Sequence, residues 1–347
     1  MTQAEVAKQP VVSVENLHVR FVMRDGTVVA AVNGVSFTLE AGQVLAILGE
    51  SGSGKSVTLR ALMRLLPPAR TRIEGRIRVA GHEIVAMDEA ALRDVRGTEI
   101  AMIFQEPMMA LDPVFTIGAQ IAETIARHEG VSYGAANRRA LELLEMVQIP
   151  SAARRLKAYP HEMSGGMRQR AMIALALSCR PCVLLADEPT TALDVTVQIQ
   201  IILLLRKLQQ ELGMAVVFVT HDVGVAVEVA DRIAVMYAGR FVEVGPTEAV
   251  IDSPAHPYTA ALLTSTVLGS AFGRRLEAIS GMPPDLRALP EGCSFAPRCR
   301  FSEDRCSASM PPEFAPTPER MTRCLRVAGR EIDLGGPNLS ERNTSRP

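Results

Sequence analysis

The sequence predicts an α/β fold in which a buried parallel sheet carries a phosphate-binding loop. The apolar segment Val44 to Leu48 is followed directly by the glycine-rich run 49–56, which precedes a helical stretch. A second apolar run, 183–187, has the composition of a buried parallel strand. Near the start of the chain, residues 12–22 and 28–39 alternate between apolar and polar positions. We therefore expect a parallel core sheet and a separate antiparallel part.

The remaining elements follow from periodicity and from helix-breaking residues. The helix after the loop is expected to run to about Leu66, because a Pro-Pro pair follows and proline cannot continue helical hydrogen bonding. From about 88 to 177 the pattern is helical, with amphipathic stretches at 117–128 and 138–147, which predicts a helical subdomain. The later elements are expected to be a long helix over 195–212, a strand over 215–219, and a hairpin of 233–236 and 241–244.

Composition indicates two domains and limits the function classes. The chain has 347 residues, 48% of them hydrophobic, which is enough for a sizeable core. Apolar stretches such as 171–177 are far shorter than the roughly 18 residues that span a bilayer, and residues 1–10 lack the apolar core of a signal peptide. The 37 basic and 38 acidic residues give a net charge of -1, which disfavours a nucleic-acid groove.

The glycine-rich run has the spacing of a P-loop and predicts a nucleoside triphosphate site. Its glycines let backbone N–H groups turn inward on a phosphate, Lys55 supplies a charge for the β and γ phosphates, and Ser56 offers a hydroxyl to Mg²⁺. The run consists of Gly49, Glu50, Ser51, Gly52, Ser53, Gly54, Lys55 and Ser56.

The apolar run that starts at Val183 ends in two carboxylates, Asp187 and Glu188. Taken alone, such an ending is as often an ordinary strand terminus as a Walker B element. In a Walker B element, Asp187 would hold Mg²⁺ through water, and Glu188 would orient or deprotonate the attacking water.

Four further motifs resemble those of the nucleotide-binding subunits of ABC transporters, and they occur along this chain in the same order as in that family. They are the Q-loop at Gln105, the signature at Ser164, Gly165 and Gly166, the D-loop at Ala192, Leu193 and Asp194, and the switch histidine His221. Met163 and Met167 depart from the generic pattern, which has Leu and Gln there, but the Ser-Gly-Gly core is intact. Phe21 stands where the family carries an aromatic that stacks on adenine, although a lone Phe in an alternating strand is often a core residue.

The resemblance implies a RecA-like core with an antiparallel β subdomain and a helical subdomain. It also implies a head-to-tail dimer that buries two ATP molecules, each between the P-loop of one subunit and the signature and D-loop of the other. Gln105 would join Ser56 and Asp187 around Mg²⁺, and His221 would contact the γ-phosphate and fix Glu188. The segment after Gln105, 106–109, would face a membrane partner.

The carboxyl-terminal part resembles the extension of dipeptide and oligopeptide importers, which nickel and glutathione importers share. The resemblance lies at 256–259, 281–284 and 292–299, and in the Met-Arg-Gln-Arg run 167–170. We expect a nucleotide-binding domain over residues 11–250, an extension over residues 251–334, and a disordered polar tail over residues 335–347.

Four of the six cysteines fall within this extension: Cys293, Cys299, Cys306 and Cys324. Thiols in a reducing cytosol rarely form structural disulfides, so metal binding is the favoured interpretation. The importers' four cysteines are associated with a [4Fe-4S] cluster, while Cys₄ ligation also suits zinc, and free or disulfide-bonded thiols stay open. The CxxC pair Cys179 and Cys182 precedes a strand and is expected to be structural.

Taken together, the resemblance implies an ATPase subunit on the cytoplasmic face of a cell membrane that energises peptide import. Its partners would be a second ATPase subunit, either a copy or a paralogue, two transmembrane permease subunits, and indirectly an external substrate-binding protein. The alternatives are the same role for nickel or glutathione, or an ABC ATPase without membrane partners. ABC ATPases without membrane partners usually have two nucleotide modules in one chain or long insertions, whereas this sequence has one module and no such insertion.

Overall fold

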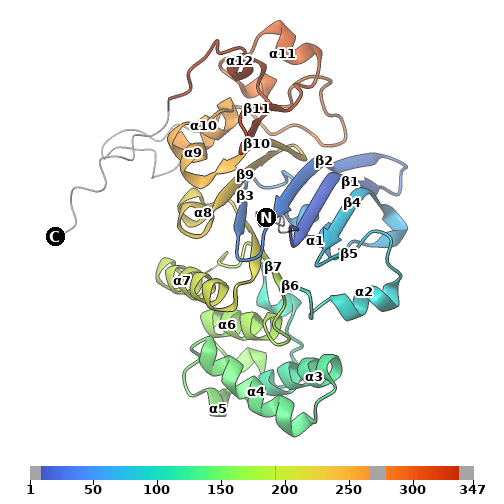
Figure 1. Ribbon diagram of the computed structural model, residues 1–347, viewed down its shortest axis with the longest axis vertical. Coiled ribbons are helices and arrows are strands. Elements are labelled where there is room, and N and C mark those ends of the chain that lie inside the picture. The colour runs from blue at the N-terminus through green and yellow to red at the C-terminus, as the bar shows by residue number, and fades with distance from the viewer. Residues whose placement is uncertain (1–8, 192, 266–278, 336–347) are drawn as a thin grey trace, which may run out of the picture.

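The computed structural model describes residues 9–191, 193–265 and 279–335 of the 347-residue chain. Two sheets organise it, one antiparallel with four strands and one mixed with eight (Figure 1). Helices α3 (Ile117–Glu129) to α6 (Gly165–Ala176) gather at the end of the molecule opposite α11 (Asp304–Ala308) and α12 (Leu325–Ala328) (Figure 1). The predicted α/β architecture is therefore confirmed. None of the described helices is both long and apolar enough to cross a membrane.

The four-stranded sheet has the order β2-β1-β4-β5. Its first two strands coincide with the predicted alternating segments, because every second residue faces a buried core. Val12, Val14, Leu17 and Val19 of β1 are buried. The strands are β1 (Val12–Val22), β2 (Val28–Leu39), β4 (Thr71–Val79) and β5 (His82–Glu83).

The eight-stranded sheet has the order β11-β12-β10-β9-β3-β8-β7-β6. Strands β9, β3, β8, β7 and β6 run parallel to one another, and β3, β8 and β7 are buried along their whole length, as expected for a sheet covered on both faces. The parallel strands are β3 (Val44–Leu48), β6 (Ile100–Ile103), β7 (Val183–Asp187), β8 (Ala215–Thr220) and β9 (Arg232–Tyr237).

Strand β6 corrects the expectation that the segment from 88 to 177 is helical throughout. Residues 100–103 pair in parallel with β7 and extend the sheet by one strand. A run of four apolar residues is too short for periodicity to separate a strand from a helix. The surrounding helices are α2 (Glu89–Val95), α3 (Ile117–Glu129), α4 (Tyr133–Met146), α5 (Ala152–Arg155) and α6 (Gly165–Ala176).

Helix α1 (Lys55–Leu62) follows the glycine-rich loop, but it ends one turn earlier than the Pro-Pro pair suggests. Arg64 takes a left-handed φ of 49°. The Leu65 N–H donates to the Arg60 carbonyl at 2.9 Å and the Arg64 N–H to the Ala61 carbonyl at 3.0 Å. This is the Schellman pattern, so local hydrogen bonding ends the helix before the prolines do. Helices α7 (Val195–Leu212) and α8 (Val223–Val229) follow β7 and β8.

The carboxyl-terminal residues join the central sheet. Strand β10 (Arg240–Pro246) forms the predicted hairpin with β9, and β12 (Arg320–Thr322) pairs with its other edge. A third apolar core, which includes Tyr237, Tyr258 and Phe295, packs this region onto the sheet. The remaining elements are α9 (Thr247–Asp252), α10 (Pro257–Thr264), α11 (Asp304–Ala308), β11 (Phe314–Thr317) and α12 (Leu325–Ala328).

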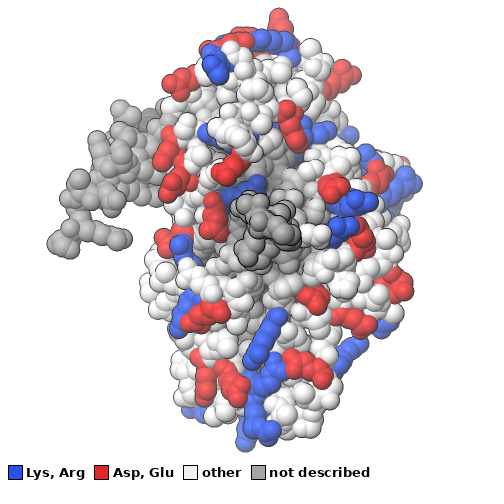
Figure 2. Space-filling model, viewed as in Figure 1, with Lys and Arg blue, Asp and Glu red and all other residues white. Residues whose placement is uncertain are grey.

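On the face shown in Figure 2, acidic and basic side chains lie side by side, in keeping with the small net charge of -1.

Candidate active site

The candidate site lies at the carboxyl ends of β3, β7 and β8, where ligands of open α/β sheets bind. The loop after β3 needs glycine at two positions. A Cβ on Gly49, whose φ is 157°, would lie 2.2 Å from the Met236 carbonyl oxygen, and one on Gly54, with φ 107°, would lie 2.4 Å from the Ala31 carbonyl oxygen. The loop can therefore take this shape only with glycine at both positions.

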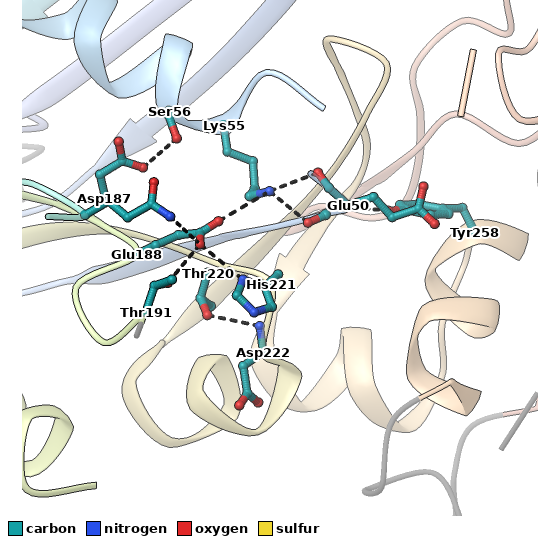
Figure 3. Close-up of polar contacts among 12 residues, drawn as sticks. Glu50, Lys55, Ser56, Asp187, Glu188, Thr191, Thr220, His221, Asp222 and Tyr258 are labelled. Carbon is teal, nitrogen blue, oxygen red and sulfur yellow. Dashed lines mark hydrogen bonds and ion pairs between the residues drawn. The ribbon is translucent and has the colours of Figure 1, made fainter. Parts of the chain in front are cut away.

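Lys55 lies inside the curve of this loop, with 4% of its side chain exposed (Figure 3). Its Nζ donates to the carbonyl oxygens of Gly49 at 2.8 Å and Glu50 at 3.0 Å, and lies 3.9 Å from Glu188 Oε1. Burial lowers the pKa of the ammonium, although the nearby carboxylates oppose that shift. Lys55 is thus a buried charge, and a phosphate is a suitable partner for it.

Ser56 and Asp187 come from different elements and meet at the base of the loop. The Ser56 hydroxyl donates to Asp187 Oδ1 at 2.6 Å (Figure 3). Burial raises the pKa of Asp187, and the hydrogen bond from Ser56 opposes that rise. A hydroxyl and a carboxylate at this separation are hard oxygen donors of the kind that Mg²⁺ prefers, so this pair fits the metal that the fold implies.

Glu188 is the point at which Gln105 and His221 meet. Its Oε2 accepts from Thr191 Oγ1 at 3.0 Å and from Gln105 Nε2 at 3.5 Å, and it lies 3.2 Å from His221 Nδ1 (Figure 3). The residue has a left-handed φ of 46°, an uncommon conformation that tertiary contacts must hold. One such contact is the hydrogen bond from its N–H to the Val219 carbonyl at 3.0 Å.

Lys55, Ser56 and Glu188 line a cleft with a free volume of about 510 Å³, together with Gln105 and His221. Asp187, which bonds Ser56, is not among the lining residues. Leu286 of the carboxyl-terminal region lines the cleft, and sequence reasoning missed it because no motif marks it. Phe21 is not among the lining residues, but lies in β1 against the apolar core, so its stacking role stays a prediction. The lining residues are Ala31, Ser51, Gly52, Gly54, Lys55, Ser56, Val57, Gln105, Glu188, His221 and Leu286.

The signature and D-loop residues do not line this cleft. The Ser164 side chain caps α6 by accepting from the Met167 N–H at 3.4 Å, and Asp194 caps α7 by accepting from the Val197 N–H at 3.0 Å. Gly165 and Gly166 begin α6. Ala192 of the predicted D-loop lies outside the described residues. One chain therefore presents these two motifs away from its own cleft.

The four carboxyl-terminal cysteines line a single cavity. The Cys293 N–H donates to the Cys306 carbonyl at 2.8 Å, and burial raises the pKa of Cys293 to about 11. Burial also raises the pKa of Cys299 and Cys324. Nevertheless, in the part of the chain that the structure describes, no three His, Cys, Asp or Glu side chains are placed to hold a metal ion. The structure does not support the expected cluster or the zinc alternative.

The other two cysteines have the surroundings expected of structural thiols. Cys182 contacts the Glu99 carbonyl oxygen at 3.2 Å, and burial raises its pKa to about 11. Cys179 lies 3.7 Å from Ser178 Oγ, and burial raises its pKa too. Both thiols are thus held in the protonated form at neutral pH, which is the less reactive one.

Two family models match the chain. Residues 32–191 match the model described as ABC transporter, and residues 242–306 match the model of the oligopeptide/dipeptide transporter C-terminal region. A peptide import ATP-binding protein of Brucella abortus is 49% identical over 333 residues, which cover 92% of this chain and 98% of the relative. The dipeptide transport ATP-binding protein DppD of Bacillus subtilis is 49% identical over 292 residues, which cover 84% of this chain and 87% of DppD.

Solved structures show the same fold. A dimeric ATP-binding cassette, MJ0796, in a post-hydrolysis state with ADP and Pi, matches with a TM-score of 0.61 and 31% identity over 68% of this chain and 98% of that one. The cbiO1 protein of Clostridium perfringens, part of an ABC transporter complex, matches with a TM-score of 0.58 and 28% identity over 70% of this chain and 90% of that one.

Proposed function

The chain belongs to the family of ABC transporter ATP-binding proteins, and we propose that it is the ATPase subunit that energises import of dipeptides or oligopeptides. The observation that carries the choice of substrate class is the match of residues 242–306 to the oligopeptide/dipeptide transporter region, in the same chain as the nucleotide site. The names of relatives such as DppD support the same substrate class. Nickel or glutathione import, or a role without membrane partners, are the alternatives.

The arrangement of the site suggests how each residue contributes to hydrolysis. Backbone N–H groups of the glycine-rich loop and the Lys55 ammonium would bind the triphosphate, while Ser56, Asp187 and Gln105 would hold Mg²⁺. When bound, the metal would supply positive charge against the phosphoryl oxygens. Glu188 orients the attacking water or accepts its proton. His221 and Gln105 keep the Glu188 carboxylate turned toward the cleft through their contacts at 3.2 Å and 3.5 Å.

The active unit is proposed to be a head-to-tail dimer. Ser164, Gly165, Gly166 and Asp194 would complete the nucleotide site of a second subunit, which is a copy of this chain or a paralogue. The position of these residues away from their own cleft supports this role, and so does the dimeric state of the matching ATP-binding cassette.

We further propose that the chain binds two permease subunits at the cytoplasmic face of a membrane and acts with an external substrate-binding protein. Met108 and Met109 follow Gln105 closely and are 45% and 68% exposed, so apolar surface is available where the family contacts its membrane partner. The domain limits are proposed at 11–250 and 251–334, with the helical subdomain at about 88–177 and a tail at 335–347.

The four carboxyl-terminal cysteines are proposed to hold a [4Fe-4S] cluster, with zinc as the alternative. The four thiols line one cavity, which is the observation behind this proposal, but the described structure does not bring three of them together as metal ligands. Cluster binding would therefore require them to move closer together and to lose their protons. Iron and sulfide analysis of anaerobically prepared protein tests the assignment, and zinc without iron would favour the alternative.

The transport proposal is tested by purifying the chain with its membrane partners and measuring uptake into vesicles. Dipeptides, longer peptides, glutathione and nickel are offered separately, with the Glu188→Gln variant as the inactive control. ATP-dependent uptake of peptides alone is the expected result. Uptake of only nickel or glutathione, or ATP hydrolysis by a chain that binds no membrane protein, would contradict peptide import.

A further inference from the structure

An arginine of the carboxyl-terminal region reaches the phosphate-binding loop. Arg298 Nη1 donates to Glu50 Oε2 at 2.8 Å, and Nη2 donates to Glu50 Oε1 at 3.0 Å. The pair is bidentate, and the Arg298 side chain is only 5% exposed. Glu50 lies inside the glycine-rich run, and its partner is 248 residues further along the chain.

The surroundings of Arg298 hold its guanidinium in place. Nη1 also donates to the Tyr237 hydroxyl at 3.2 Å, and the guanidinium lies 5.9 Å from the centroid of the Phe295 ring. Tyr258 packs on Tyr237 with ring centroids 4.5 Å apart, and its hydroxyl accepts from the Glu50 N–H at 2.9 Å (Figure 3). Both the backbone and the side chain of Glu50 are therefore held by this region.

The same guanidinium also holds the chain that leads to Leu286, a residue that lines the cleft. Arg298 Nε donates to the Ser280 carbonyl oxygen at 2.9 Å. A few residues further along, Leu286 lines the cleft, and its carbonyl oxygen accepts from the Ala30 N–H at 3.3 Å. One buried side chain thus contacts the loop and anchors the segment that carries Leu286.

Glu50 places a carboxylate in a loop that receives a triphosphate. An unpaired negative charge on Glu50 would repel the phosphates, and the low dielectric of a partly buried site would strengthen that repulsion. The loop's own cation cannot offset it fully, because Lys55 Nζ bonds the Glu50 carbonyl oxygen and also lies near Glu188. Glu50 therefore needs a cation of its own.

We propose that Arg298 is a positioning residue for nucleotide binding, which cancels the charge of Glu50 and holds the phosphate-binding loop in the form that accepts ATP. The inference rests on ATP binding by this family. It adds that the carboxyl-terminal region controls the affinity of the nucleotide site. This role does not require that the cysteines bind a metal.

The test measures ATP binding to the full-length chain by titration in the presence of Mg²⁺. Arg298→Met should weaken ATP binding by about thirtyfold, at the low end of the cost of removing one partner of a buried charge pair. Binding of ADP, which carries one phosphate fewer, should be weakened less than binding of ATP. Raising the ionic strength should shrink the defect, because salt screens the repulsion.

The decisive variant is the double mutant Glu50→Gln with Arg298→Met. If the unpaired carboxylate causes the defect, removing it should restore ATP affinity to within about threefold of the wild type, as expected for coupled residues. Arg298→Lys keeps the positive charge but cannot make the bidentate contact with Glu50, so the ATP affinity of this variant should lie between those of the wild type and Arg298→Met. Arg305→Met is the matched control, because Arg305 pairs with Glu303 in the same region but on the surface.

Three results would overturn the inference: wild-type ATP affinity in a folded Arg298→Met variant, no restoration in the double mutant, or an equal loss in Arg305→Met. If Arg298 only stabilises the fold, both Arg298→Met variants should melt at a lower temperature, and Glu50→Gln should not restore binding. A wild-type chain that binds no ATP would instead contradict the proposed function, so the two failures are distinguishable.

Discussion

Replacing Glu188 with Gln should separate ATP binding from ATP hydrolysis. The amide keeps the size of the side chain and an oxygen for the contacts at Oε2, but it cannot accept a proton from water. General-base catalysis contributes roughly 10²- to 10⁴-fold, so turnover in the assembled transporter should fall by at least about a hundredfold.

The same substitution should tighten ATP binding. Glu188 Oε1 lies 3.9 Å from Lys55 Nζ and would compete with a bound nucleotide for that ammonium. At this separation, two charges attract by about 4 kcal/mol with an effective dielectric constant near 20 and by about 1 kcal/mol in water. Releasing part of this interaction corresponds to an affinity gain on the order of tenfold.

The assay combines a nucleotide titration with phosphate release. Glu15→Gln is the matched control, since Glu15 also lies 3.9 Å from a cation, Arg76, but both side chains are exposed. Glu15→Gln should change neither the ATP affinity nor the rate of phosphate release. Near wild-type turnover of Glu188→Gln would remove Glu188 from the catalytic role, and unchanged affinity would show that its attraction to Lys55 does not oppose ATP binding.

The other predictions concern the remaining site residues. Lys55→Ala should lower ATP affinity and turnover together, because in the proposed role the ammonium would contact phosphate in both the ground state and the transition state; a change in turnover alone would contradict this. Ser164→Ala should reduce hydrolysis at the partner's site but leave Mg-ATP binding by the isolated subunit nearly intact, and weakened binding there would refute the role in trans. Burial raises the pKa of Asp187, so its ionised form destabilises the fold as pH rises through the folded pKa. Asp187→Asn should therefore raise the melting temperature of the nucleotide-free chain at pH 7 and lose stabilisation by Mg-ATP; an unchanged melting temperature would contradict the burial argument. Anaerobically prepared protein should contain about four irons per chain. Cys293→Ser should remove the iron and Cys182→Ser should not; equal loss in both variants would refute the assignment.

Much of the nucleotide site could be predicted because its residues are consecutive along the chain. Strand β3, the loop 49–56 and the start of α1 form one local unit, and the strand that ends at Asp187 is marked by its apolar run. Each of these features depends on neighbouring residues, so composition and spacing are enough to find them.

The features that were missed depend on distant parts of the chain or on short runs. Strand β6 is four residues long, so its apolar run did not separate it from the helices around it. Leu286 lines the cleft and Arg298 pairs with Glu50 only because the carboxyl-terminal region folds back onto the loop. No local pattern marks such contacts, and the tertiary structure is needed to find them.

The pairing of β12 with β10 affects how the chain can fold and be shortened. Until residues 320–322 are made, one edge of β10 has no partner, and an open strand edge can pair with another molecule. Glu243 of β10 is fully buried, pairs with Arg320 and accepts from the Ala255 N–H, so a chain cut near residue 250 would lose these partners of the carboxylate. The ATPase portion therefore should not be a stable fragment by itself, and during synthesis its sheet stays incomplete until almost the whole polypeptide has left the ribosome.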